Sequence, residues 1–160
     1  MKKFLFFLIT LVIINNTYSQ DYKSGIGVRA GYSNGISFKS FISNKNALEF
    51  FATNRYGGFA LTGMYLFQDQ SVNPFDVEDL SFYYGLGAHV GYYDKDRYYS
   101  FNYIVNDQVF NLGVDCVFGA EYKVPTVPIT LSIDVKPFID FIGNVRFLPL
   151  DFGISIRYVF

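Results

Sequence analysis

The feature that most constrains this chain is a two-residue alternation of large apolar side chains with small or polar ones. It is clearest from Leu80 to Tyr92, where Leu, Phe, Tyr, Ala and Val alternate mainly with Ser, Gly and His. The same pattern returns from Phe110 to Tyr122 and from Leu150 to Phe160. A period of two is typical of β-strands whose two faces meet different surroundings. The chain is therefore predicted to be all-β.

Clusters of Gly, Asn, Ser and Pro divide the rest of the chain into further short strands. Eight strands are expected, each close to or above the roughly 9–11 residues with which a tilted strand crosses a bilayer. The third and fourth alternate less cleanly, because Phe51, Met64 and Leu66 fall on the polar face, so their boundaries are soft. The expected strands are 25–32, 36–42, 47–55, 59–68, 80–92, 110–122, 129–139 and 150–160.

The first residues have the organisation of a secretory signal peptide. Lys2 and Lys3 precede an apolar run from Phe4 to Ile14, and small or polar residues follow as far as Ser19 and Gln20. The apolar run is shorter than the roughly 20 residues that a spanning helix needs. We therefore expect residues 1–19 to be a signal peptide cut near Ser19 or Gln20, with residues 20–160 forming one domain.

Composition excludes several classes of function. Only 17% of residues are charged and the formal net charge is -1, so the chain lacks the basic surface of a nucleic-acid-binding protein. The single cysteine permits neither an internal disulfide nor a multi-thiolate metal site. No cofactor and no metal are expected.

The orientation of the two strand faces decides between two kinds of barrel. An eight-stranded barrel has an interior that side chains just fill, and the apolar face is too bulky for it. The opposite face carries glycines and scattered charges, which suit a narrow lumen. The chain is therefore predicted to form an antiparallel, up-and-down, eight-stranded transmembrane β-barrel with a plugged polar lumen, and the alternative is a secreted, lipocalin-like binder of an apolar ligand. The inward charges expected to pair are Arg29, Lys39, Glu49, Asp115, Glu121, Asp134, Lys136 and Arg157.

An even number of strands places both termini on one side, the periplasm in this layout, with longer loops outside. The longest expected loop, 94–108, combines charge with exposed aromatic rings suited to contact with an extracellular ligand. Its candidate contact residues are Tyr98, Tyr99, Phe101 and Tyr103.

The last strand resembles the assembly signal that the barrel-assembly machinery reads in bacterial outer-membrane barrels. Its alternate residues are Phe152, Ile154, Ile156, Tyr158 and the final Phe160. The segments Ser19-Gln20, 134–138 and 156–160 also resemble small Bacteroidetes outer-membrane barrels of the OmpA/OmpX-like, eight-stranded class. This resemblance implies an integral outer-membrane, porin-like protein of the cell envelope with outer-membrane lipid around it.

His89 is the one histidine, so any catalytic triad must include it. Some eight-stranded outer-membrane barrels modify lipid A with a His and a Ser two residues later, but here that position is Gly91. Ser81, on the same face, is about 25 Å away at about 3.3 Å per residue. We therefore expect His89 to fill the lumen, and the protein to be non-enzymatic with a structural or surface-interaction role. A lipid A-modifying enzyme using His89 and a gated ion pathway are the alternatives.

Overall fold

The structure is a computed structural model that describes residues 22–69, 77–94, 108–142, 146–148 and 151–160. None of these residues belongs to a helix long and apolar enough to cross a membrane. The strands are β1 (Ser24–Gly31), β2 (Asn34–Phe41), β3 (Asn46–Arg55), β4 (Gly58–Asp69), β5 (Leu80–Asp94), β6 (Gln108–Lys123), β7 (Ile129–Val135), β8 (Phe138–Asp140), β9 (Arg146–Leu148) and β10 (Phe152–Val159).

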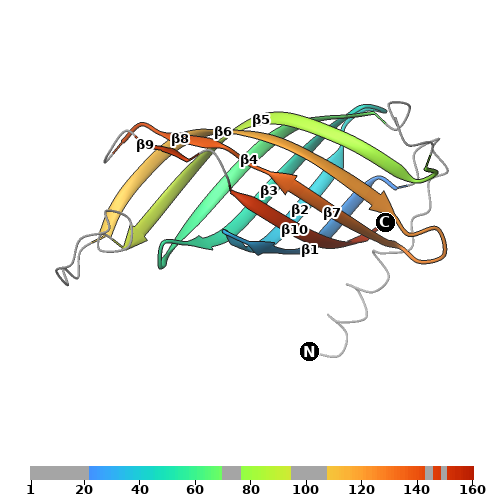
Figure 1. Cartoon of the computed structure of the whole chain (residues 1–160), viewed down its shortest axis with the longest axis horizontal. Coiled ribbons are helices and arrows are strands. Elements are labelled where there is room, and N and C mark those ends of the chain that lie inside the picture. The colour runs from blue at the N-terminus through green and yellow to red at the C-terminus, as the bar shows by residue number, and fades with distance from the viewer. Residues whose placement is uncertain (1–21, 70–76, 95–107, 143–145, 149–150) are drawn as a thin grey trace, which may run out of the picture.

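The strands form one antiparallel sheet that closes on itself (Figure 1). Neighbours in sequence pair from β1 to β6, and β1 pairs with β10 to complete the ring. Both β7 and β8 pair with β6, while β9 pairs with β8 and β10 with β7. β7 and β8 together take the place of one strand in the barrel wall, and so do β9 and β10. The ten segments therefore form a closed eight-stranded antiparallel barrel. This confirms the predicted all-β barrel.

Two connections differ from the prediction. The expected strand 129–139 is interrupted, because Pro137 has no N–H to donate to a ladder. The carbonyl of Pro137 instead accepts a hydrogen bond from the Cys116 N–H at 2.8 Å, and the Lys136 N–H donates to Asp151 O at 2.8 Å. The stretch 143–149, expected to be a connection throughout, contains β9.

The two ends of the barrel are distinct. The Ser24 N–H donates to Phe160 O at 2.8 Å, so both termini of the barrel domain lie at one end, which we call the terminal end. The opposite end, which we call the loop end, carries the β1–β2 and β3–β4 turns and the far ends of β5 and β6 (Figure 1). The β3–β4 turn is tight, with φ of 49° at Tyr56 and 72° at Gly57, a pattern typical of two-residue hairpins.

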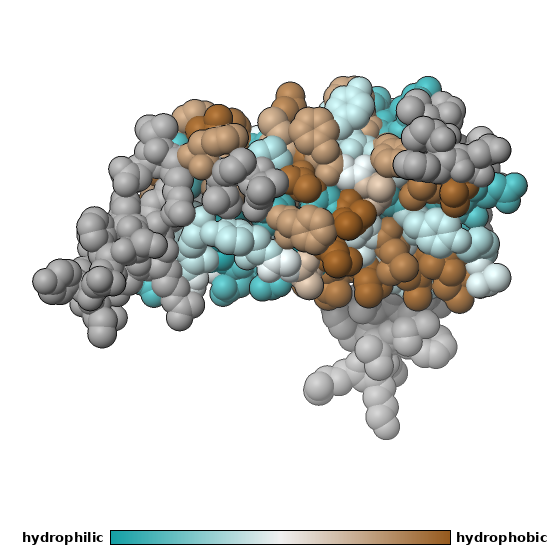
Figure 2. All heavy atoms as spheres, viewed as in Figure 1, coloured by the Kyte–Doolittle hydropathy of each residue, from teal (hydrophilic) through white to brown (hydrophobic). Residues whose placement is uncertain are grey.

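The faces of the wall are oriented as predicted. Leu86 is 67% exposed and Ile156 49%, whereas the neighbouring Arg157 is fully buried inside the barrel. Apolar side chains gather on the outer face over β1, β7 and β10 (Figure 2). The uneven alternation of β3 and β4 reflects apolar side chains inside the barrel. Phe51 and Leu66 are buried within the lumen, and both strands keep their register.

Candidate functional site

The barrel interior holds a large set of buried charged and polar side chains. The alternation of the strands brings all eight sequence-predicted charges into it, each no more than 3% exposed. They divide into two groups of four, one toward each end of the barrel, and the group at the loop end is joined by four further buried side chains, Arg55, His89, Asp140 and Asp151. We call them the terminal-end cluster (Lys39, Glu49, Glu121 and Arg157) and the loop-end cluster (Arg29, Arg55, His89, Asp115, Asp134, Lys136, Asp140 and Asp151).

Arg157 on β10 is the centre of the terminal-end cluster. Its Nη2 donates to Glu49 of β3, and its Nη1 donates to Glu121 of β6 at 3.2 Å. Two hydroxyls complete its environment, with Nη1 2.7 Å from Ser132 Oγ and Nε 3.1 Å from Ser37 Oγ. One guanidinium therefore joins β10 to four other strands of the barrel.

Glu121 accepts hydrogen bonds from several further side chains at this end of the lumen. Lys39 Nζ lies 3.1 Å from each of its carboxylate oxygens, and Gln68 Nε2 donates to Oε1 at 2.8 Å. The Tyr22 hydroxyl donates to the same oxygen, and the Tyr22 ring packs edge-on against Phe41 with centroids 5.2 Å apart. Burial, reinforced by the Glu121 charge, raises the pKa of Tyr22 well above its ordinary value, so this phenol stays a donor. Tyr22 thereby fills the terminal end of the lumen.

In the loop-end cluster, Asp151 faces three cations. Its carboxylate accepts from Ser33 Oγ at 2.8 Å and lies 3.4 Å from Arg29, 3.5 Å from Arg55 and 3.5 Å from Lys136. Because these cations come from β1, β3 and the link between β7 and β8, one carboxylate connects widely separated parts of the wall.

A second carboxylate, that of Asp134, links the loop-end cluster to the Tyr83 side chain. Arg29 Nη1 lies 2.5 Å from Asp134 Oδ1, and the Tyr83 hydroxyl donates to Asp134 Oδ2 at 3.1 Å. Asp134 therefore has both a charge partner and a neutral donor.

His89 is also part of the loop-end cluster. Its Nδ1 lies 2.6 Å from Asp115 Oδ2 and its Nε2 lies 2.9 Å from Asp140 Oδ1. The ring meets Phe138 edge-on at 5.5 Å, and Lys136 Nζ is 3.4 Å from the other oxygen of Asp115. The two ring nitrogens point to different carboxylates, so the three side chains form a bridge and do not converge on one point. No group of three or more metal-ligating side chains is found in the described part of the chain.

An apolar layer touches both charge clusters. It consists of the buried side chains of Ala47, Phe51, Met64, Leu66, Tyr83 and Val117. On the loop-end side, Arg29 and Lys136 lie 5.7 and 5.6 Å from the Phe51 ring. On the terminal-end side, Lys39 lies 4.9 Å from the Tyr83 ring. The described residues thus place two buried polar clusters in the lumen, with packed apolar side chains in contact with both.

Sequence reasoning missed three members of this interior network. Arg55 and Asp151 lie at the ends of the expected strands 47–55 and 150–160, and Asp140 lies one residue beyond the expected strand 129–139. The signal was present, because Arg55 continues the inward series from Glu49 and Asp140 continues that from Asp134.

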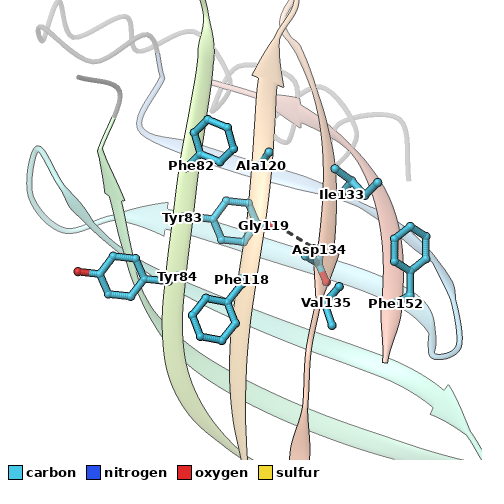
Figure 3. A pocket seen from close by; sticks show the side chains of 10 residues that line it. All are labelled: Phe82, Tyr83, Tyr84, Phe118, Gly119, Ala120, Ile133, Asp134, Val135 and Phe152. Carbon is cyan, nitrogen blue, oxygen red and sulfur yellow. Dashed lines mark hydrogen bonds between the residues drawn. The ribbon is translucent and has the colours of Figure 1, made fainter. Parts of the chain in front are cut away.

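On the outside, a shallow apolar groove crosses the wall where β5, β6, β7 and β10 meet (Figure 3). Phe82, Phe118, Ile133 and Phe152 stand around it, and Gly119 leaves its floor thin. A Cβ on Gly119 would lie 2.5 Å from the Tyr83 ring and 2.8 Å from the Asp134 Cβ. At Gly119, therefore, only the backbone of β6 separates the groove on the outside from the polar side chains on the inside.

The remaining predicted residues fall into two groups. Tyr98, Tyr99, Phe101 and Tyr103 lie outside the described residues. The alternate residues of the last strand all face outward and are 45–52% exposed, on a strand paired with β1 and β7: Phe152, Ile154, Ile156, Tyr158 and Phe160.

Comparison with protein-family models, with curated proteins and with solved structures gives no match for this chain. The class that the fold defines is a closed eight-stranded β-barrel with buried charged side chains inside and exposed apolar side chains outside.

Proposed function

We propose that this protein is a small, non-enzymatic, integral protein of the bacterial outer membrane, with its lumen closed by ion pairs and any specificity supplied by its outer loops. The observation that carries the proposal is the reversed distribution of side chains. Large apolar residues such as Leu86, Phe118 and Phe147 are at least 60% exposed, whereas Arg29, Arg157 and Lys39 are buried.

The free energies of transfer favour a lipid environment for this surface. The buried Lys and Arg side chains are paired inside the barrel, while large apolar side chains are exposed on its wall, and contiguous exposed apolar surface marks an interaction site. Lipid also requires every backbone polar group to be paired, which ring closure between β1 and β10 supplies. An apolar exterior around a polar interior is the arrangement of transmembrane barrels.

The interior supports a structural role for the lumen. A narrow eight-stranded barrel has room for side chains and little else, and here Arg157 and Asp151 each bridge several strands through it. The apolar layer around Phe51 and Leu66 adds a second barrier to ions. These contacts favour a plug over a gated pathway.

The location and partners follow from the resemblance of the last strand. In this proposal β10 is read by the barrel-assembly machinery, both termini face the periplasm, and outer-membrane lipid surrounds the wall. The loop at 94–108 would then face outward and contact any extracellular ligand.

The geometry gives less support to the alternatives. Both nitrogens of His89 are occupied by carboxylates within a filled lumen, so the ring has no free nitrogen to activate a hydroxyl. A lipocalin-like carrier would need an apolar cavity where this barrel has its charge clusters.

Envelope fractionation combined with a boiled-versus-unboiled gel tests the proposal. We expect the protein in the outer-membrane fraction, with faster migration before boiling that is lost on heating. A soluble periplasmic or secreted protein would overturn the location. Lipid A mass spectrometry with and without expression tests the enzyme alternative, and a mass change that depends on His89 would overturn the non-enzymatic role.

A further inference from the structure

His89 sits in a position that a neutral imidazole does not satisfy. A neutral ring has one N–H and one lone pair, whereas an ionised carboxylate only accepts hydrogen bonds. Here both nitrogens face carboxylate oxygens, at 2.6 Å for Asp115 and 2.9 Å for Asp140. A neutral ring between two ionised carboxylates would place a lone pair against one of them. The geometry thus requires one additional proton among the three groups.

The imidazole is the natural holder of that proton. It is a stronger base than a carboxyl group by more than two pKa units in reference peptides. Lys136 Nζ lies 3.4 Å from Asp115 and so favours the ionised form of that carboxylate. A proton on His89 satisfies both contacts with charge-assisted hydrogen bonds.

The charge balance of the loop-end cluster also favours a proton on His89. Its permanent cations are Arg29, Arg55 and Lys136, while it holds four carboxylates. A proton on His89 would raise the number of cations in the cluster to four, equal to its number of carboxylates. The terminal-end cluster, with two cations and two carboxylates, is already neutral without one.

The bridge also has a mechanical consequence. β8 has three residues and is separated from β7 by the interruption at Pro137. His89 extends from β5 across Gly113 of β6 to Asp140 of β8, and a Cβ on Gly113 would lie only 2.5 Å from the His89 ring. The ring therefore fastens a short, interrupted strand to a wall position two strands away.

We propose that His89 is a buried imidazolium that binds one proton as the counter-ion of Asp115 and Asp140, and that this proton fastens β8 to the loop end of the barrel. The groups that face it are Asp115 on β6, Asp140 on β8 and Arg55 on β3, with Lys136 behind Asp115 and Tyr93 of β5 near the two carboxylates. Burial opposes the proton most strongly and Arg55 adds to that opposition, while the hydrogen bonds and charges of the two carboxylates favour it and outweigh both. The fastening is therefore present at neutral pH and lost as the pH rises.

The single histidine makes a direct test possible. The full chain, refolded in detergent micelles, is labelled with ¹⁵N at histidine only, and long-range ¹H–¹⁵N spectra are recorded from pH 5 to 9.5. We expect the spectrum of the doubly protonated ring at pH 7.5, above the ordinary titration range of histidine. A neutral tautomer at pH 7.5 would overturn the proposal. Because this readout concerns the ring alone, it is independent of whether the barrel resides in a membrane.

Two variants separate the bridge from a general effect of charge. Asp140→Asn removes one of the two carboxylate partners, and we expect the His89 midpoint to fall by about one pH unit, a tenfold loss of proton affinity. Asp134→Asn removes a carboxylate of the same cluster that contacts Arg29 and not His89, and it should move the midpoint much less. Equal shifts in the two variants would contradict the bridge. Should Asp140→Asn fail to fold, Asp115→Asn replaces it, and the wild-type spectrum alone remains decisive.

Discussion

Replacing Arg157 with leucine removes the centre of the terminal-end cluster. The guanidinium contacts Glu49, Glu121, Ser37 and Ser132, and none of these side chains is more than 3% exposed. Arg157→Leu leaves two buried carboxylates with Lys39 as the one cation of that cluster. Breaking a buried ion pair by removing one partner costs about 3–5 kcal/mol, because an uncompensated charge remains. We therefore expect a loss of about 3–5 kcal/mol in the free energy of unfolding.

Urea unfolding of the refolded barrel in lipid vesicles, followed by gel mobility and circular dichroism, measures this loss. The matched control is the double variant Arg157→Leu with Glu49→Gln, which removes the unpaired carboxylate as well. It should be more stable than Arg157→Leu alone, because the buried carboxylate that lost its partner is no longer charged. A single variant within about 0.5 kcal/mol of wild type, or a double variant that is less stable still, would refute the reasoning.

The same variant tests whether the lumen is plugged. The apolar layer of Phe51, Met64 and Leu66 does not include Arg157, so these side chains remain in the lumen of the variant. Planar-bilayer recordings of Arg157→Leu should therefore show no stable conductance. Stable channels in this variant would show that the ion pairs act as a gate.

Three further substitutions test separate parts of the wall. Gly119→Val should cost about 1–3 kcal/mol through overpacking against Tyr83, whereas Ala120→Val, on the outer face of the same strand, should leave urea unfolding nearly unchanged. Equal effects of the two would contradict the assigned faces. Tyr22→Phe removes a donor to a charged carboxylate and should destabilise the barrel by about 1.5–3 kcal/mol. An unfolding midpoint equal to that of wild type would show that Tyr22 does not secure the terminal end.

The faces of the wall could be predicted because alternation is a local property. Once Leu86 faces outward, Gly85 and Gly87 must face inward, and no knowledge of the partner strand is needed. The same rule placed Arg29 and Arg157 inside. Uneven alternation at Phe51 and Leu66 indicated soft strand boundaries, but its physical meaning was an apolar layer inside the lumen.

The pairing of charges could not be predicted to the same depth, because it depends on register and on strand tilt across the lumen. His89 and Asp140 are 51 residues apart and lie on strands that are not neighbours. Asp151 meets Lys136 because the wall is interrupted at Pro137, and the alternation pattern contains no sign of that break. The glycines near His89 indicated that the lumen has space for its ring. They did not indicate the two carboxylates that contact its nitrogens.

The orientation of the barrel in lipid is tested most directly by a charge placed on its outer wall. Leu86→Arg, 67% exposed at the middle of β5, should lower the free energy of unfolding in vesicles by about 2–4 kcal/mol, and Tyr92→Arg, near the loop end, by about 0–1 kcal/mol. A water-soluble barrel would tolerate both changes within about 0.5 kcal/mol. Equal stability of the two variants and wild type, with folding in lipid-free and detergent-free buffer, would contradict a membrane-facing wall.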